Sequence, residues 1–394
     1  MHSDHRYRIL FVAHSAQQGG AEYCLDTTLR YLDRNRFEPI VVFPHEGPMV
    51  EAARSIGIDV EILPLSHWMC VSRAPWYWKH LIMGTLPSIM RLRRLIRRLR
   101  INIVYSNTSA IFEGALCARW AGVPHLWHVH EVLSSATGLS PVLPVAWIRR
   151  FIRKFSSLVV FESHSARAAF ESRTPLPAAK VVPNSIRLAD ANETNRDEAR
   201  RQLGVGPDAI VVAFVGQLID RKNPLLLVDA IKRIRNDRVV GIFVGDGPLA
   251  SALDKEIQSS ALDDRIRRIP FQSNVGPLLD ALDILVLPSR EESFGLVLIE
   301  AAACGKPVVA CRSQGPNEVV VSDETGILVD QDDPIGLSNA IARLASSERL
   351  RAQLGQAARR RAFEVFDPQK NTVQLEQLMD QLISGKGKAH GCAR

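Results

Sequence analysis

The sequence predicts an α/β protein made of two doubly wound halves. Short apolar runs that are typical of buried strands alternate with helical segments along the whole chain. The polar stretch 187–208 interrupts this alternation once, and the same pattern restarts at Ile210–Val215. The length of 394 residues is also too large for one ordinary core. Two domains joined by one linker are therefore expected.

The predicted strands follow one another regularly in both halves. In the first half they are expected at 8–14, 39–43, 60–65, 101–105, 126–130, 158–161 and 181–182. In the second half they are expected at 210–215, 239–244, 266–271, 284–287, 308–311 and 327–329. Helices are expected at about 19–32, 87–100 and 368–383, the last of them amphipathic. We expect an N-terminal domain at 1–185, a second domain at 186–365, and a C-terminal helix with a polar tail at 366–394.

Composition is typical of a soluble globular protein, with 46% hydrophobic and 23% charged residues. The six cysteines include no Cys-x-x-Cys pair, so neither a zinc site nor a disulfide framework is indicated and a cytoplasmic location is expected. The N-terminus lacks the apolar core of a signal peptide, and no apolar run is long enough to predict a spanning helix.

Charge is distributed unevenly between the two halves. Residues 1–185 carry 22 Lys and Arg against 13 Asp and Glu, whereas the remainder carries 27 against 29. The excess positive charge therefore belongs to the first half. This asymmetry predicts an anionic surface as partner of the first half and a small ligand for the second.

The segment 288–307 carries the strongest site signal in the chain. It follows the apolar run 284–287 and precedes the expected strand 308–311, and it contains its own helix signals. Ser293 is the expected N-cap of the helix, and Gly305 is expected to end it. The unit is thus strand, acidic loop, helix and strand.

Two carboxylates of this segment lie eight positions apart, Glu292 in the loop and Glu300 in the helix. Because eight residues return to nearly the same side of a helix, both can face the carboxyl end of a parallel strand, where open α/β sheets bind ligands. The first helical turn is expected to present backbone N–H groups to a phosphate. These N–H groups belong to Phe294, Gly295 and Leu296.

Other strand-to-helix turns carry glycines and basic residues. Gly19 and Gly20 open the first expected helix, where backbone can come close to a ligand, although a simple tight turn explains them equally well. The second half restarts with a strand followed by a glycine and a basic pair, and a later strand ends in another glycine. These residues are Gly216, Arg221, Lys222 and Gly245. No dinucleotide fingerprint or P-loop is present.

Taken together, these motifs resemble the retaining glycosyltransferases of family 4, which have the GT-B fold. The resemblance lies in Glu-x7-Glu with Phe-Gly just inside it, Gly216 with Lys222, Gly-Asp-Gly at 245–247, and further matches at 315–319 and 325–329. It also includes Asn184 in Val-Pro-Asn-Ser. The dispersed matches occur in the family's order and cover residues 19–329.

The resemblance implies two Rossmann-like domains that face a cleft, with the C-terminal helix crossing back to the N-terminal domain. It implies transfer of a sugar, with retention at the anomeric carbon, from a nucleoside diphosphate to an acceptor. The usual setting is cell-surface polysaccharide assembly, so a lipid-linked saccharide is the expected acceptor. No cofactor, metal ion or nucleic acid is expected.

The resemblance also assigns site residues. His130, Lys222 and Glu292 are the expected catalytic residues. The expected donor-binding residues are Gly19, Gly20, Gly216, Gln217, Arg221, Lys222, Gly245, Ser293, Phe294, Gly295, Leu296 and Glu300. Gln217 stands where the family usually has an arginine, so Arg221 is a candidate to supply the missing guanidinium. Lys222 suits phosphate as a point charge.

Two further groups of polar residues have alternative interpretations. His128 and His130 alternate along one strand, so their rings are expected on the same side. Such a pair could ligate metal, but no third ligand is evident. We therefore favour His130 as a hydrogen-bonding site residue and His128 as a structural group. The carboxylates of 330–333 contain Asp-x-Asp, but they precede Pro334 at a helix start and are interpreted as capping.

Rival functions on the same fold are a sugar-nucleotide epimerase, a phosphorylase and a catalytically silent nucleotide-sugar binding subunit. Release of free nucleoside diphosphate that depends on an acceptor separates transfer from the epimerase and the phosphorylase, whereas donor binding without turnover across an acceptor panel would support the silent subunit. Gln217 is the best argument for the silent subunit.

Two basic segments of the first half favour peripheral binding to anionic lipids at the inner face of the cytoplasmic membrane. The segment 91–100 surrounds an apolar stripe with six arginines, and 147–155 repeats the combination. An aromatic segment at 76–83 lies just upstream. The alternative is that these are ordinary helices whose stripes pack on the sheet.

Overall fold

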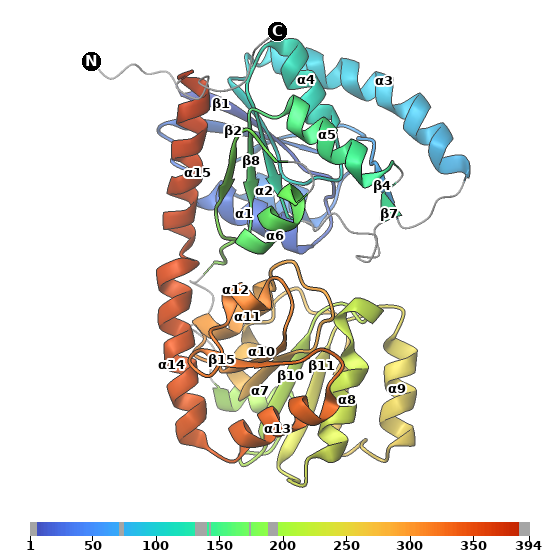
Figure 1. Cartoon of the computed structure of the whole chain (residues 1–394), viewed down its shortest axis with the longest axis vertical. Helices are drawn as coiled ribbons and strands as arrows, with labels where there is room; N and C mark the ends of the chain where they lie inside the picture. The colour runs from blue at the N-terminus through green and yellow to red at the C-terminus, as the bar shows by residue number, and fades with distance from the viewer. Residues whose placement is uncertain are drawn as a thin grey trace. The chain divides into compact units, whose positions relative to one another are not determined.

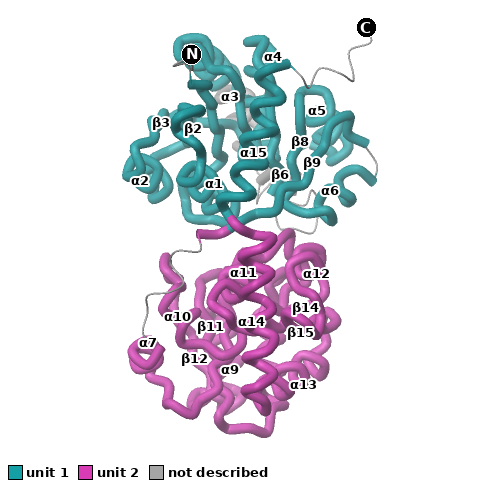
Figure 2. The backbone as a smooth tube through the Cα atoms, turned by 90° about the vertical axis from the view of Figure 1, so that its left-hand side faces the viewer, with its two compact units in different colours: residues 1–185, 368–394 teal, residues 186–367 magenta. Residues whose placement is uncertain are grey.

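The computed structural model describes residues 6–70, 75–130, 140–141, 143–172, 175–187 and 196–385, with backbone alone at 69–70, 75–84 and 140–141. The chain divides into two compact units, which Figure 2 shows in different colours. Unit 1 consists of residues 1–185 and 368–394, and unit 2 consists of residues 186–367. Each is described by itself below.

Unit 1 is built on a seven-stranded parallel sheet with the strand order β3-β2-β1-β5-β6-β8-β9. Its strands are β1 Tyr7–Val12, β2 Phe37–Phe43, β3 Asp59–Ile62, β5 Ile103–Ser106, β6 His125–Val129, β8 Leu158–Phe161 and β9 Ala179–Val181. A short antiparallel pair is formed by β4 Met69–Cys70 and β7 Ser140–Pro141. The order reverses beside β1, as in doubly wound folds.

Helices cover both faces of this sheet (Figure 1). Side chains alternate along each strand, so neighbours such as Phe11 and Val12 enter different cores. One core includes residues of α1, α2 and the C-terminal helix α15, and the opposite cores include residues of α3, α4, α5 and α6. The bounds are α1 Gly20–Tyr31, α2 Pro48–Ser55, α3 Pro75–Arg98, α4 Glu113–Ala121, α5 Val145–Phe155, α6 His164–Glu171 and α15 Pro368–Ile383.

The C-terminal helix α15 belongs to unit 1 although the chain reaches it last. Leu375 and Met379 are buried in the same core as α1. The buried carboxylate of Glu376 accepts a hydrogen bond from the backbone N–H of Asp33 at 2.7 Å, just after α1. The helix therefore packs, together with α1 and α2, on one face of the first sheet. Its bounds agree with the sequence prediction.

Unit 2 repeats the architecture with a six-stranded parallel sheet in the order β12-β11-β10-β13-β14-β15. The strands are β10 Ile210–Val215, β11 Val239–Val244, β12 Ile266–Ile269, β13 Ile284–Leu287, β14 Val308–Cys311 and β15 Gly326–Val329. The helices are α7 Arg196–Gln202, the 3₁₀ turn η2 Asp220–Lys222, α8 Pro224–Arg233, α9 Ala250–Ser259, α10 Gly276–Ala281, α11 Leu296–Ala303, α12 Pro316–Val319, α13 Pro334–Ala345 and α14 Glu348–Val365. The two Rossmann-like sheets confirm the predicted fold class.

Several predicted bounds were wrong by a few residues, and one helix was predicted much shorter than it is. The helix expected at 87–100 begins at Pro75, because Pro87 lies inside α3 rather than at its start. The strand expected at 60–65 is 59–62, and the strand expected at 266–271 ends at Ile269. Among the described residues, no helix has both the length and the apolar composition that crossing a bilayer requires.

Candidate functional site

In unit 2, the candidate site residues follow three neighbouring strands. Gly216 to Lys222 follow β10, Gly245 follows β11, and the segment 289–295 follows β13. Strand β10 lies between β11 and β13 in the sheet, and all three are parallel. Their carboxyl ends therefore meet at one edge, which brings the loops that the sequence analysis singled out into one region.

Glycine allows the first two of these loops to pack backbone against backbone. The φ of Gly245 is +145°, and a Cβ atom built there would lie 2.0 Å from the carbonyl oxygen of Gly216. Gly216 in turn donates its N–H to the carbonyl of Val244 at 3.0 Å. Any side chain at position 245 would force the loops apart. The predicted residues Gly216 and Gly245 are thus adjacent.

The β10 and β13 loops are joined by an ion pair between Lys222 and Glu292. Lys222 Nζ donates to Glu292 Oε2, and the two side chains are only 13% and 8% exposed. Ser289 Oγ lies 3.4 Å from the same carboxylate oxygen and donates to it. The sequence predicted both residues for the site but not their direct contact. A cation and a carboxylate that are both largely buried therefore contact each other at the carboxyl edge of the second sheet.

Arg290 holds the surrounding loops together. Its Nη1 lies 3.0 Å from Asp220 Oδ1, and its Nε lies 2.8 Å from Asp332 Oδ1. Asn223 donates to that same Asp332 oxygen at 2.9 Å. The sequence analysis missed Arg290. Arg290 is the third residue after β13, and this position at the carboxyl end of a parallel strand could have pointed to it.

The neighbouring residues Gln217 and Arg221 take different positions. Gln217 is exposed, whereas Arg221 is partly buried and its guanidinium lies 3.4 Å from the carbonyl oxygen of Glu291. The carbonyl of Arg221 accepts the N–H of Arg290 at 2.9 Å. Arg221 thus lies against the loop that carries Glu292.

The capping interpretation of 330–333 is correct for Asp333. Its side chain accepts the N–H groups of Ile335 and Gly336 at the start of α13, at 3.1 and 2.9 Å. Within the described residues, no group of three or more His, Cys, Asp and Glu side chains is arranged to hold a metal ion.

The start of α11 differs from the prediction. The helix begins at Leu296, and its N-cap is Gly295 with φ +90° and no side-chain cap. Ser293 is therefore not the N-cap, and Phe294 and Gly295 precede the helix rather than forming its first turn. Phe294 is buried against Phe366, so it cannot lie in the first exposed turn of the helix. The left-handed conformation of Gly295, which glycine tolerates, then redirects the backbone so that the helix begins at Leu296.

Glu300 lies on α11, and its carboxyl group titrates unusually. Burial raises the pKa of Glu300 from 4.5 to about 7. A buried carboxyl group with its pKa near neutrality is a candidate site residue, because such shifts cluster at functional sites. This property is independent of the sequence spacing that first singled out the residue.

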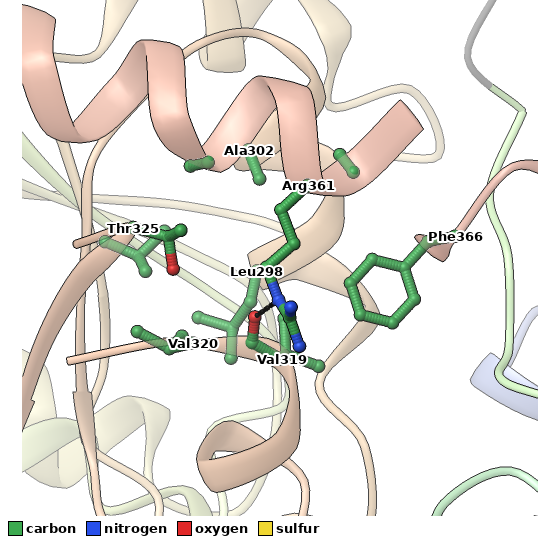
Figure 3. A pocket seen from close by; sticks show the side chains of 10 residues that line it. Leu298, Ala302, Val319, Val320, Thr325, Arg361 and Phe366 are labelled. Carbon is green, nitrogen blue, oxygen red and sulfur yellow. Dashed lines mark hydrogen bonds between the residues drawn. The ribbon is translucent and has the colours of Figure 1, made fainter. Parts of the chain in front are cut away.

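A separate small pocket lies beneath α11 and α14 (Figure 3). Leu298, Val319 and Phe366 contribute to its largely apolar lining, and the guanidinium of Arg361 donates to the carbonyls of Val319 and Glu318. Its volume of about 10 Å³ holds about one water molecule. None of the predicted site residues lines it, so we assign it to core packing.

In unit 1, the predicted histidines lie at the end of β6. The rings of His128 and His130 are 4.0 Å apart between centroids, which confirms that both lie on the same side of the strand. Burial and the neighbouring His130 lower the pKa of His128. His128 Nδ1 lies 2.5 Å from the Tyr105 hydroxyl, which fits the structural role expected for it.

His130 lies between polar side chains that follow neighbouring strands. Its Nε2 is 3.2 Å from Asn107 Oδ1, and its Nδ1 is 3.7 Å from Glu162 Oε2. Asn107, His130 and Glu162 are all buried. The sequence analysis missed Asn107 and Glu162. A polar residue within one or two positions of a strand's carboxyl end was the signal that could have found them.

The predicted glycine turn lies beside this group. Gly19 is the N-cap of α1 without a side-chain cap, and Gly20 is the first helical residue. The next carbonyl, that of Ala21, accepts a hydrogen bond from Asn107 Nδ2 at 2.8 Å. The turn at 19–20 is therefore linked to His130 through one asparagine.

Comparison with known families assigns both units. The profile "Glycosyltransferase Family 4" matches residues 18–190, and the profile "Glycosyl transferases group 1" matches residues 195–361. Together these two matches cover most of the chain.

Relatives and solved structures agree with these profiles. The chain is 26% identical to the UDP-Gal:alpha-D-GlcNAc-diphosphoundecaprenol alpha-1,3-galactosyltransferase of Escherichia coli over 76% of this chain and 81% of that enzyme. It is 38% identical to the D-inositol 3-phosphate glycosyltransferase of Salinispora arenicola, but over only 42% of this chain and 40% of that enzyme. The structure of Anabaena HepE in complex with UDP and glucose has a TM-score of 0.82 at 24% identity, covering 95% of this chain and all of HepE.

The raised pKa of Glu300 predicts a specific dependence of stability on pH. Because the unfolded carboxyl loses its proton near 4.5 and the folded one near 7, the folded state binds more protons between these values. The free energy of unfolding should therefore fall as the pH rises from 4.5 to 7, by on the order of 1–3 kcal/mol from this group. Glu300→Gln should remove that part of the slope.

The measurement is urea unfolding of the parent and of Glu300→Gln at pH 5, 6, 7 and 8. Glu324→Gln, at a solvent-exposed position of the same unit, serves as the matched control. Identical slopes for the parent and Glu300→Gln would contradict the assignment.

Proposed function

The chain belongs to the GT-B glycosyltransferases, with a family 4 domain in unit 1 and a group 1 domain in unit 2, and from this premise we propose that it is a retaining enzyme which uses a nucleoside diphosphate sugar. The observation that carries the proposal is the Lys222–Glu292 pair at the carboxyl edge of the second sheet. Phosphate needs a cation and sugar hydroxyls need acceptors, and this pair supplies both at one point.

Each residue has a distinct role in the proposed donor site. Lys222 binds the diphosphate and stabilises the negative charge that grows on it as the sugar leaves. Arg221, beside it, provides a second cation for the diphosphate in place of the arginine that Gln217 replaces. Glu292 accepts hydrogen bonds from the sugar, and Glu300 accepts those from the ribose hydroxyls. Gly216 and Gly245 let the nucleotide approach the backbone.

The proposed transfer occurs on one face of the sugar. The bond between the anomeric carbon and the phosphate oxygen breaks, and the acceptor oxygen forms a new bond on the same side. The acceptor's proton passes to the departing phosphate oxygen, so no separate base is required. Because Lys222 and Arg221 supply positive charge, we propose that the reaction proceeds without a metal ion or another cofactor.

The acceptor is assigned to unit 1, and we propose a saccharide carried on a lipid. The relative from Escherichia coli acts, by its name, on a sugar linked to diphosphoundecaprenol. Unit 1 also carries the excess of positive charge found in the sequence. A lipid-linked acceptor would bring the enzyme to the cytoplasmic face of a membrane, which suits a role in cell-surface polysaccharide synthesis.

Exposed side chains on the basic helices of unit 1 support the membrane proposal, but the apolar stripe of α3 does not. Leu92, Leu95 and Ile96 are buried in the core, so the apolar stripe of α3 packs on the sheet as the alternative interpretation held. Helix α4 packs against α3 and α5. Four large apolar side chains nevertheless remain exposed on these three helices, namely Leu86, Met90, Trp120 and Trp147. The aromatic side chains of 76–83 lie outside the described residues.

Exposed cations lie on two of the same helices. On α3, Arg91, Arg94 and Arg97 are exposed, and Arg98 pairs with Glu61 at 2.6 Å. On α5, Arg150, Arg153 and Lys154 are exposed. Cations next to exposed apolar side chains are the combination that binds an anionic bilayer surface.

Turnover tests the proposed function directly. Purified protein incubated with a panel of nucleotide sugars and lipid-linked acceptors should release nucleoside diphosphate and form a product larger by one sugar, as followed by mass spectrometry. Lys222→Ala should lower kcat by roughly 100- to 1,000-fold, because it removes a charge that acts on the leaving phosphate. Lys232→Ala, which removes a surface pair with Glu256, is the matched control and should keep parental kcat.

Nucleoside diphosphate released without any acceptor would favour an epimerase or a hydrolytic side reaction. Donor binding without turnover across the whole panel would favour a silent binding subunit. Full turnover by Lys222→Ala with a parental melting temperature would remove this loop from the site.

Nucleotide affinity separates the two carboxylates. Glu300→Ala should weaken both the nucleotide sugar and the free nucleotide, since a lost acceptor leaves ribose hydroxyls unpaired at a cost of roughly 1–3 kcal/mol. Glu292→Ala should weaken the nucleotide sugar but leave the free nucleotide unchanged or tighter. Isothermal titration calorimetry measures both. Parental nucleotide affinity in Glu300→Ala would show that this residue does not bind the ribose.

Membrane contact is tested by co-sedimentation with liposomes. Vesicles containing anionic lipid should capture the protein, capture should fall with added salt, and it should weaken when Arg93, Arg94, Arg97 and Arg98 are neutralised, because each basic residue near an anionic surface contributes about 1 kcal/mol. Neutralising Arg349 and Arg360 of unit 2 is the control and should leave capture unchanged. Equal partition onto neutral and anionic vesicles, or none onto either, would assign α3 and α5 to structure alone.

A further inference from the structure

A row of polar groups crosses five neighbouring strands at the carboxyl edge of the sheet in unit 1. The sheet runs β1-β5-β6-β8-β9, and one polar group follows each of these strands in turn. They are the Ala21 carbonyl in the helix after β1, Asn107 after β5, His130 after β6, Glu162 after β8 and Asn184 after β9. All four side chains are buried. We call this set the polar row.

The contacts of the polar row run from one member to the next. Asn107 Nδ2 donates to the Ala21 carbonyl at 2.8 Å, and Asn107 Oδ1 lies 3.2 Å from His130 Nε2. On the other side of the ring, His130 Nδ1 lies 3.7 Å from Glu162 Oε2. That same oxygen accepts a hydrogen bond from Asn184 Nδ2 at 2.5 Å.

The first half of the row determines which nitrogen of His130 carries a proton. Because the amide nitrogen of Asn107 donates to the Ala21 carbonyl, its oxygen must be the atom that faces the ring. An amide oxygen accepts and cannot donate, so the facing Nε2 has to be the donor. The position of α1 thereby fixes the tautomer of His130.

The second half of the row places a carboxylate beside the other nitrogen. The oxygen of Glu162 that faces Nδ1 also accepts the hydrogen bond from Asn184, which restricts its movement. At 3.7 Å the contact with Nδ1 is longer than a hydrogen bond, and it becomes an ion pair only when Nδ1 carries a proton. The ring is thus bounded on both edges by acceptors from β5 and β8.

We propose that the polar row is a positioning device for His130 and that Glu162 is its decisive positioning residue. Glu162 itself does not touch substrate; Asn107 sets Nε2 as the donor, and the carboxylate of Glu162 confines the ring from the Nδ1 side. Where it concerns turnover, this inference rests on the proposed function and on the catalytic role that the sequence analysis expects of His130. The hydrogen bonding of His130 can be measured without any substrate, so the two can fail separately.

The test compares the parent with Glu162→Gln, which keeps the shape of the side chain and removes its charge. Nitrogen-15 spectra of histidine-labelled protein, with His130 identified by the loss of its signals in His130→Gln, report both ring nitrogens under one set of conditions. In the parent, Nε2 should carry a slowly exchanging proton. In Glu162→Gln, the Nδ1 resonance should shift while the melting curve remains cooperative.

The same variants are then assayed for sugar transfer. Glu162→Gln should lower kcat by roughly 10- to 100-fold with the KM for the nucleotide sugar changed less than about threefold, because a misplaced ring affects the reaction more than donor binding. Asn184→Ala should act in the same direction and more weakly. Glu113→Gln is the matched control, since Glu113 is another fully buried carboxylate of unit 1 that accepts from the Ser66 N–H outside the row.

An unchanged Nδ1 resonance in Glu162→Gln would overturn the inference whatever happens to turnover. A shifted resonance with parental kcat would also overturn it, because the row would then hold the ring without serving the reaction. A parent that transfers no sugar would refute the proposed function, and the spectra alone would then decide whether Glu162 positions His130. Equal effects of Glu113→Gln and Glu162→Gln on kcat would reduce the row to ordinary core stability.

Discussion

The parallel direction of neighbouring strands is the constraint on which both candidate sites depend. Strands that run in the same direction end at the same edge of the sheet, so the residues that follow them are brought together however far apart they lie in sequence. In unit 2 this places Lys222 against Glu292, 70 positions later. In unit 1 it aligns Asn107, His130, Glu162 and Asn184. Both groupings lie in segments that follow parallel strands, with α1 and η2 supplying further contacts.

Much of this fold could be predicted because the buried strands have an unambiguous pattern. The strands at 210–215, 239–244, 284–287 and 308–311 were predicted at their exact bounds, since each is a continuous apolar run that ends in glycine, proline or a polar residue. The helix at 368–383 was equally clear from its apolar spacing. The errors fall where local signals compete with packing. Ser293 has the chemistry of an N-cap, yet burial of Phe294 shifts the start of α11 to Leu296.

The site was predictable to a smaller extent. Lys222, Glu292 and Glu300 were singled out through motif spacing and a family resemblance, which name residues but not contacts, and their place in a donor site stays a prediction. The ion pair, the raised pKa of Glu300 and the role of Arg290 depend on how loops from different strands approach one another. Sequence separation conveys none of that. Glu162 was missed because a single glutamate after a strand resembles any solvated residue, and only its burial distinguishes it.

The Lys222–Glu292 pair also explains how the proposed donor site could recognise a whole nucleotide sugar. A buried lysine or carboxylate without a partner is costly, and the pair removes that cost while no ligand is bound. A phosphate that binds Lys222 replaces one anion by another, so the lysine stays paired, but Glu292 keeps only the hydrogen bond from Ser289. The hydroxyl groups of the donor sugar restore hydrogen bonds to that carboxylate, whereas a free nucleotide has none to offer at that point. In the proposed donor site, this one contact between two loops therefore favours the nucleotide sugar over its product.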